Sequence, residues 1–342
     1  MIKPSVPQNV IYAGHKSAYC NDKEIDVKAL AKRASDYQDR WVDNVVDNSE
    51  GANFKFTEDR KLVYKTIDGN VRVADITQKA FGQLCSKVGV PAKYILKCFD
   101  SGLTELAISN FMHWSKNCNT NFLVREQDGV VMAVLSDKYV PYSSASAIKV
   151  LQAIVPSNSF VPTGYYMDSE RMHLRYITKE PIAADKGSNI YAGVRVENSE
   201  IGNASLNATY FLYRQVCKNG MLRTLKDSEL FRMSHMGEKM TSGKIETFSK
   251  SFNKALDLNN NTVGLIDEAQ KHIMNQNEAL YFVGKAQKAL KLSEKSMDKL
   301  QNLLSTVYDT SRWGILNGFT ELSHDFTLDT MEDIERWAGN NL

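Results

Sequence analysis

The sequence predicts an α+β protein: an antiparallel or mixed sheet built from hairpins, flanked by helices and followed by a helical C-terminal region. Three observations favour this class. Runs that alternate apolar and polar residues meet repeatedly at turn dipeptides, as the strands of β-hairpins do. Segments with apolar residues at helical spacing separate these hairpins. Residues 244–308 contain no proline and continue the helical spacing over a long stretch.

The N-terminal part is predicted to contain one hairpin among short helices. Residues 54–75 alternate around Asp68-Gly69, a dipeptide that supplies the positive-φ positions of a tight turn. Helices are expected around this hairpin at 28–41, 77–87, 91–98 and 102–116. Gly89 should end the second of these helices, and Pro91 should open the third.

The central part repeats the hairpin pattern. Asp128-Gly129 joins two β-rich runs within residues 122–142, and a helix is expected behind them at 143–155. Further strands are predicted at 160–166, 171–178, 190–197 and 205–216. This spacing does not suit a doubly wound parallel sheet, and the sequence contains no glycine-rich phosphate-binding motif.

The C-terminal part is predicted to be helical. A long helix is expected at 263–307, and the Asn-rich residues 257–262 should separate it from an earlier helix. Shorter helices are expected at 312–322 and 330–338, with Asp329 as the N-cap of the second. These changes of character divide the chain into three predicted regions: 1–120, 121–243 and 244–342.

Composition excludes several classes of protein. The 342 residues include 42 basic and 40 acidic side chains, so the net charge of +2 indicates no particular partner. Five cysteines without a C-x-x-C pair predict a reduced, cytoplasmic protein. No apolar run reaches the roughly 18 residues needed to cross a bilayer. Histidines and cysteines lie too far apart in sequence for a structural zinc site, and we expect no metal or cofactor.

Local segregation of charge predicts a nucleic-acid site. Residues 207–226 carry four basic side chains, three aromatic rings and no acidic residue, and residues 171–179 repeat the combination. Single-stranded nucleic acid needs cations for its phosphates and flat rings for its bases. Residues 320–342 carry six acidic side chains against one basic. The predicted binding residues are Arg171, Arg175, Tyr176, Tyr210, Tyr213, Arg214, Lys218, Arg223 and Lys226.

Other interpretations stay open at this point. The same alternation fits an amphipathic strand with rings in the core and cations in solvent. An enzyme acting on a nucleotide or small molecule would use Cys217, His235 and Glu200, although an isolated cysteine is more often a small core residue. A protein-interaction module would use the long helix, with the acidic tail blocking or mimicking a DNA surface. Residues 80–98 also have the spacing of a helix–turn–helix.

Five motifs occur in an order that resembles a known family. They are FLVREQDGVVMAVLSDKYVPY at 122–142, NSEIG at 198–202, YRQVCKNGM at 213–221, the segment around His235, and WGILNGFTE at 313–321 followed by His324. Together they resemble the phage- and plasmid-encoded family catalogued as domain of unknown function nine hundred and thirty-two. The resemblance extends from about Phe81 to His324.

This resemblance implies a mobile-element origin, a cytoplasmic setting and, by association with DNA-metabolism genes, a role in replication, recombination or host takeover. Annealing proteins of phages also combine hairpins, a basic aromatic groove and assembly into homo-oligomers, which is an analogy of architecture. The motif residues are mostly hydrogen-bonding or turn-forming, which favours recognition over covalent catalysis. They are Asn198, Ser199, Glu200, Tyr213, Arg214, Cys217, Asn219, Gly220, His235, Trp313 and Asn317.

Overall fold

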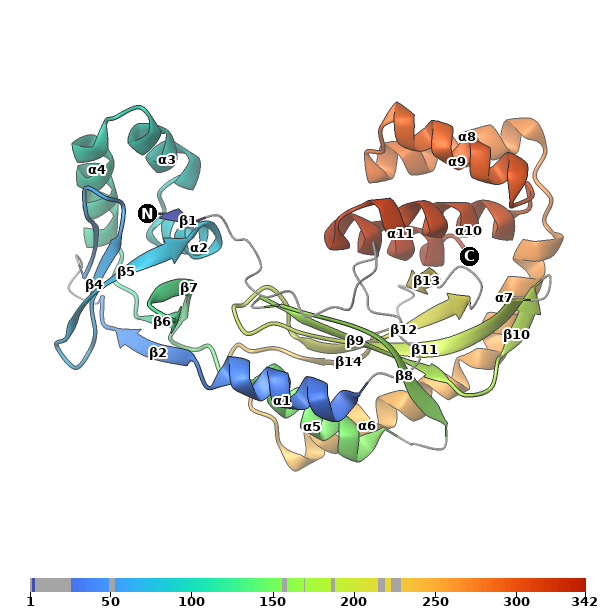
Figure 1. Cartoon of the computed structure of the whole chain (residues 1–342), viewed down its shortest axis with the longest axis horizontal. Coiled ribbons are helices and arrows are strands. Elements are labelled where there is room, and N and C mark those ends of the chain that lie inside the picture. The colour runs from blue at the N-terminus through green and yellow to red at the C-terminus, as the bar shows by residue number, and fades with distance from the viewer. Residues whose placement is uncertain are drawn as a thin grey trace.

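A computed structural model describes residues 2–3, 26–48, 53–155, 159–168, 170–185, 188–214, 219–222 and 229–342. It confirms the predicted α+β class, with two sheets and a helical C-terminal part. Figure 1 shows the two sheets at different places in the molecule, the first carrying helices from the N-terminal part and the second lying between two layers of helices. The surface between the two sheets is the setting of the candidate site described below.

The first sheet is mixed. Its strands are β1 (Ile2–Lys3), β2 (Trp41–Val46), β3 (Phe54–Phe56), β4 (Leu62–Lys65), β5 (Val71–Thr77), β6 (Phe122–Gln127) and β7 (Val130–Ser136). The order is β2-β6-β7-β5-β4-β3, and β5 runs parallel to both β1 and β7. The predicted hairpin turn at Asp128-Gly129 is confirmed, because both residues have a positive φ.

Three helices cover one face of this sheet, as the sequence predicts. They are α2 (Gln78–Val88), α3 (Ala92–Asp100) and α4 (Thr104–Lys116). Thr77 caps α2 through its hydroxyl, and Gly89 ends the helix with a left-handed φ of 82°. Phe56 of β3 meets Phe99 of α3 and Phe111 of α4 edge to face, and its ring centroid lies 5.5 Å from that of Phe81 of α2, so one aromatic side chain contacts all three helices.

The second sheet is antiparallel. Its strands are β8 (Phe160–Met167), β9 (Met172–Thr178), β10 (Ala183–Asp185), β11 (Ser188–Asn198), β12 (Leu206–Arg214), β13 (Asn219–Leu222) and β14 (Glu229–Met233). The order is β13-β12-β11-β9-β8, with β10 beside β11 and β14 beside β12. The hairpin β6–β7 therefore lies in the first sheet, although the predicted central region begins at residue 121. The three region boundaries stay a prediction.

Helices lie on both faces of the second sheet (Figure 1). One layer consists of α1 (Val27–Gln38), α5 (Ser144–Ile154) and α6 (Ser242–Asp257), and the other contains α10 (Arg312–Leu322) and α11 (Leu328–Asn340). Phe252 of α6 meets Phe160 and Tyr176 edge to face and forms part of the largest apolar core. The strand residues between these core positions point to the opposite face of the sheet, which α11 covers.

The predicted long helix at 263–307 is wrong. Three helices replace it: α7 (Asn259–Lys271), α8 (Gln276–Leu290) and α9 (Glu294–Thr306). Asn275 and Glu278 form a capping box that starts α8, and Lys291 ends it with a positive φ. The predicted break within residues 257–262 is confirmed, because α6 ends at Asp257 and α7 begins at Asn259; the two helices meet at Leu258, and the rest of the Asn-rich segment belongs to α7.

The start of α11 differs slightly from the prediction. Its N-cap position is Thr327 rather than Asp329, which lies inside the first turn. A short 3₁₀ helix at Ser323–Asp325 links α10 to α11. Within the described ranges, every helix is too short or too polar to cross a membrane.

We predict that a side chain at position 193 would disturb packing in the second sheet, so that glycine is needed there for full stability. A Cβ atom there would lie 2.4 Å from the Phe211 ring and 2.7 Å from the Tyr176 carbonyl oxygen. Gly193→Ala should therefore lower the free energy of unfolding by about 1–3 kcal/mol in urea denaturation. Gly284→Ala is the matched control: Gly284 has open space around it within α8, so alanine should stabilise the protein slightly. Equal stability of the two variants would contradict the prediction.

Candidate functional site

A polar cleft of about 1200 Å³ lies between the two sheets. One wall comes from α2 and the end of β7, and the other comes from residues 202–207 and the segment that follows β14. Its described lining contains Gln78, Lys79, Gln83, Ser86, Lys87, Ser136, Glu197, Asn203, Ser205, Asn207, Arg232, Ser234, His235 and Met236, together with Gly82, Val134, Leu135, Tyr139, Gly202 and Ala204. Polar and apolar atoms contribute almost equally to this surface, and the polar half consists mainly of amide, hydroxyl and cationic groups.

Three cations stand on facing walls of the cleft. Lys79 and Lys87 are exposed on α2, and Arg232 is exposed at the end of β14. Partial burial lowers the pKa of Lys87, and the nearby Asp137 carboxylate opposes this shift. Arg232 pairs with Glu229 at 3.6 Å, in an exposed pair that contributes little to stability. An anion in the cleft would meet positive charge from both sides.

The segment Asn198–Ile201, which we call the junction, connects the two sheets. The Asn198 amide donates to the Tyr142 carbonyl at 3.0 Å, and its oxygen lies 3.1 Å from Nε2 of His235. Nδ1 of His235 lies 3.2 Å from the Val140 carbonyl oxygen, and burial lowers the pKa of this imidazole. A neutral imidazole carries one N–H group, so it donates to either the Val140 or the Asn198 oxygen and not to both at once. The Tyr139 ring stacks on His235 at 5.1 Å. This arrangement fixes the chain between β7 and α5 against the end of β14.

Glu200 and Arg125 continue the junction toward the first sheet. Oε1 of Glu200 accepts from the Ser144 amide at 2.8 Å, where α5 begins. The Glu200 carbonyl accepts from Arg125, whose guanidinium also binds both carboxylate oxygens of Asp43 at 2.7 Å. Burial raises the pKa of Glu200, and the hydrogen bond from Ser144 opposes this shift. Gln83 of α2 completes the joint by donating to the Ile201 carbonyl at 2.9 Å.

Behind the cleft, six charged or ionisable side chains form a buried charge cluster. Alternation along β9 and β11 places four of them on one face of the sheet, because His173 is paired in register with Glu197 and Arg175 with Arg195. Helix α11 contributes two acids three residues apart, on one side of the helix. The cluster consists of His173, Arg175, Arg195, Glu197, Glu332 and Glu335.

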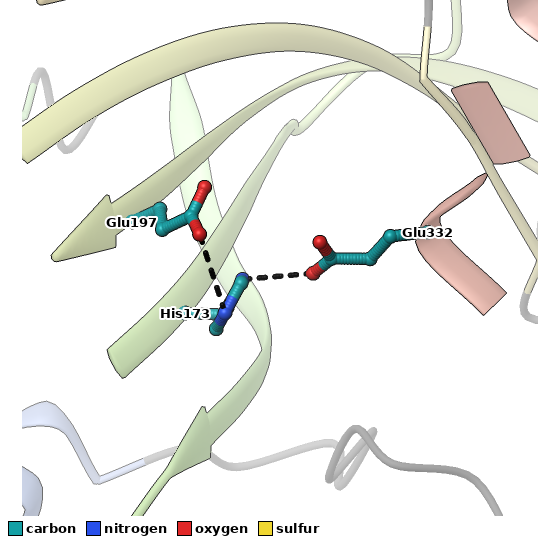
Figure 2. Close-up of side chains that lie close together, drawn as sticks. All are labelled: His173, Glu197 and Glu332. Atoms are coloured by element: carbon teal, nitrogen blue, oxygen red, sulfur yellow. Dashed lines mark ion pairs between the residues drawn. The ribbon is translucent and has the colours of Figure 1, made fainter. Parts of the chain in front are cut away.

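Short ion pairs hold this charge cluster together. Arg175 lies 2.7 Å from Glu335, and Arg195 lies 2.7 Å from Glu332. Nδ1 of His173 is 3.0 Å from Glu332, and its Nε2 is 3.8 Å from Glu197. Figure 2 shows the imidazole between the two carboxylates, which come from the sheet and from α11. All of these groups except Glu197 are at most 9% exposed in their side chains, so each requires its partner.

The two glutamates of α11 respond to burial in opposite ways. Burial alone would raise the pKa of Glu332, but Arg195 and His173 outweigh it and hold that pKa well below its usual range. For Glu335, burial dominates and raises the pKa, although Arg175 opposes the shift. Glu332 is therefore the firmly ionised anchor of the charge cluster.

A metal ion is not needed to explain the charge cluster. The ligand atoms of His173, Glu197 and Glu332 all lie within 4.8 Å of one another, a spacing that would suit a divalent cation. However, the Arg195 guanidinium lies 2.7 Å from Glu332 and 3.6 Å from Glu197. A protein cation thus already balances both carboxylates, and the geometry describes an ion-pair network.

A family model described as domain of unknown function (DUF932) matches residues 131–334, more than half of the chain. The chain belongs to the DUF932 family. The DUF932 match runs from β7 into α11, so it contains the junction, the β14 side of the cleft and five of the six residues of the charge cluster. Comparisons with curated proteins and with solved structures found no match.

The residues predicted from the resemblance mostly make contacts within the fold, where the structure describes them. Asn198, Ser199 and Glu200 form the junction, and His235 is bound to it. Asn317 donates to the Trp313 carbonyl at 2.8 Å inside α10, where both side chains are buried. In β13, Asn219 and Gly220 pair with Arg214 and Tyr213 of β12. Cys217 lies outside the described residues.

Base stacking on the predicted tyrosines is wrong. Tyr176 is 3% exposed, Tyr210 is 1% exposed and Tyr213 is 6% exposed, so their rings are covered. The first two belong to the core beneath α6, and Tyr213 packs with Ile177 and Phe211 on the opposite face. A covered ring offers no face to an unpaired base. The amphipathic-strand interpretation describes these rings correctly.

The predicted single basic groove is also wrong. Strand β11 separates β9 from β12, and alternation places Arg175 and Arg214 on opposite faces of the sheet. Arg175 is buried in the charge cluster, and Arg171 binds Asp329 of α11 at 2.6 Å. Arg214 lies over the Tyr308 ring at 5.7 Å. The remaining predicted cations, Lys218, Arg223 and Lys226, lie outside the described residues.

The enzyme hypothesis gains no support from the described residues. Both ring nitrogens of His235 face oxygen atoms of Asn198 and Val140 within the fold, and the Glu200 carboxylate binds the start of α5. A general base needs a ring nitrogen or carboxylate within reach of substrate. These groups instead connect segments of the fold.

Sequence reasoning missed the cations of the cleft. A readable signal was present in α2, where Lys79, Gln83 and Lys87 recur at four-residue intervals opposite apolar Phe81 and Leu84. Arg232 had no such signal, because only the folding of β14 against β12 brings it to the facing wall. Glu332 and Glu335 were noticed only as part of an acidic tail.

Asn198→Ala tests the junction. The substitution leaves the buried Tyr142 carbonyl and His235 without their amide partner, so we expect unfolding free energy to fall by about 1–3 kcal/mol in urea denaturation. Asn253→Ala, on the exposed side of α6, is the matched control and should change stability by less than about 0.5 kcal/mol. A junction variant as stable as the control would show that these hydrogen bonds do not support the fold.

Glu332→Gln tests the charge cluster through its dependence on pH. Because the folded-state pKa is depressed, the stability from this carboxylate is complete above the ordinary glutamate pKa of about 4.3 and is lost as pH falls through the folded value. The variant should lose about 3–5 kcal/mol at pH 7, and the deficit should shrink as pH falls below about 4. Urea denaturation across this range measures it. The exposed Glu246→Gln serves as control; a deficit that does not vary with pH refutes the assignment.

Proposed function

We propose that the protein binds single-stranded nucleic acid in the cleft between its two sheets, as part of the DNA metabolism of a mobile genetic element. The observation that carries this proposal is the presence of Lys79, Lys87 and Arg232 on facing walls of one open polar cleft. Phosphate neutralisation by such cations supplies most of the affinity of sequence-independent nucleic-acid binding. The acidic residue in the lining, Glu197, is already paired within the charge cluster.

The size of the cleft supports a strand over a small molecule. Pockets for drug-sized ligands occupy about 300–1,000 Å³ and are mostly apolar, whereas this cleft has about 1200 Å³ and a lining that is about half polar.

The rim supplies contacts other than charge. Met236 is 53% exposed at the edge of the cleft, and its flexible thioether can pack against a base. Ser86 on α2 and Ser205 and Ser234 on the other wall add hydroxyl groups that bind phosphate or sugar oxygens. These contacts are independent of base identity, which suits a protein that handles strands of many sequences.

Charge reversal on α2 tests the proposal. Anisotropy of labelled oligothymidine, measured from low to physiological salt, should show binding by the natural protein that weakens as salt rises. The variant Lys79→Glu/Lys87→Glu should bind at least about tenfold more weakly, with a log–log salt slope shallower by about 1.4, for two phosphates at about 0.7 each.

The control is Lys285→Glu/Lys295→Glu, which changes charge equally on exposed positions of α8 and α9. It should leave affinity within about twofold. Absence of binding by the natural protein, or equal loss in both variants, overturns the proposal. Annealing the probe to oligoadenine tests strandedness, since the duplex should bind more weakly than the single strand.

A further inference from the structure

The surface of the second sheet beneath α11 is basic. Arg171, His173 and Arg175 recur at alternate positions along and just before β9, and Arg195 stands beside Arg175 on β11. Alternate residues of a strand lie roughly 6.8 Å apart on one face. The structure thus contains a row of cations on one sheet face, separate from the cations of the cleft.

Helix α11 covers this row with acids at three-residue intervals. Asp329 binds Arg171 at 2.6 Å, Glu332 binds Arg195 at 2.7 Å and Glu335 binds Arg175 at 2.7 Å. Apolar residues of α11 pack in two cores: Ile334 lies in the core formed with α8, α9 and α10, and Ala338 lies in the largest core, which contains the second sheet. The contacts of α11 with Arg171, Arg175 and Arg195 are ionic, so the helix also presents to the sheet a line of negative charges like that of a polyanion.

Only another anion can replace α11 on this face. Arginine stays charged at any physiological pH, and a buried guanidinium without a counter-ion is strongly unfavourable. Glu197 belongs to the charge cluster and also lines the cleft, so the two surfaces are contiguous. A strand that occupies the cleft would reach the edge of the row beneath α11.

We propose that Arg171, Arg175 and Arg195 form a second nucleic-acid-binding face that α11 occupies in the free protein as an internal polyanion mimic. The strand in the cleft extends onto this face when its phosphates replace Asp329, Glu332 and Glu335. This inference rests on the proposed function, because it supplies a longer path for the same ligand. It also gives the acidic C-terminal segment a specific role, which is to limit binding to strands long enough to compete.

Hydrogen–deuterium exchange on the natural protein tests the displacement directly. With saturating oligothymidine, amides of α11 should exchange at least about tenfold faster than in the free protein, and those of β9 should not become faster. Unchanged or slower exchange in α11, at an oligonucleotide concentration that saturates the cleft, overturns the inference.

Substitutions test the competition separately. Glu332→Gln/Glu335→Gln removes both buried negative charges while retaining side-chain shape, and should raise affinity for oligothymidine about tenfold, with a salt slope steeper by about 1.4. Glu294→Gln/Asp298→Asn removes the same charge from exposed positions of α9 and should change affinity by less than about twofold. Equal effects of the two pairs overturn the inference. If the first variant does not fold, the exchange measurement decides.

A combined variant distinguishes this inference from the proposed function. In the background Lys79→Glu/Lys87→Glu, the substitutions Glu332→Gln/Glu335→Gln should restore measurable binding through the uncovered face. If the cleft substitutions weaken binding and the α11 substitutions do not restore it, the second face is refuted and the cleft proposal stands. If the cleft substitutions leave binding unchanged and the α11 substitutions enhance it, the cleft proposal is refuted and the second face is supported.

Discussion

Ionic pairing between α11 and the second sheet is the interaction on which the arrangement of this molecule depends. Two buried arginines and a histidine on β9 and β11 cannot stay in the fold without acidic partners, and Glu332 and Glu335 supply them. Because those acids belong to the last helix, the position of α11 on the sheet is set by charge as well as by apolar contact. The helices that pack against α11 are positioned with it.

This pairing also decides which surfaces are available to a ligand. The cations of β9 are covered, and the rings that accompany them in sequence lie in apolar clusters. What stays open is the cleft, whose walls belong to different sheets and whose geometry depends on the junction between them. Asn198 and Glu200 of the junction make structural hydrogen bonds, and His235 contacts Asn198. These residues therefore shape the cleft, and other residues supply the cations that line it.

Local features could be predicted from sequence because local chemistry determines them. Asp128-Gly129 specified a hairpin turn and Gly89 a helix end, since few residues adopt positive φ without strain. The capping box at Asn275 and Glu278 was also readable and would have divided the predicted long helix. Pairing between distant strands was not readable: the place of β11 between β9 and β12 determines that Arg175 and Arg214 face opposite ways. Half of the cleft, the polar stripe of α2, could be found from sequence, while the partner wall depends on tertiary folding.

Binding of a single strand in the cleft is tested most directly by covalent cross-linking to an oligonucleotide that carries photoreactive bases, with the cross-linked peptides identified by mass spectrometry. We expect adducts in residues 78–87 of α2 and in residues 232–236 at and just after the end of β14, which form the two walls of the cleft. Adducts found only away from the cleft and from α11, for example in α8 or in the β4–β5 hairpin, would contradict binding in the cleft.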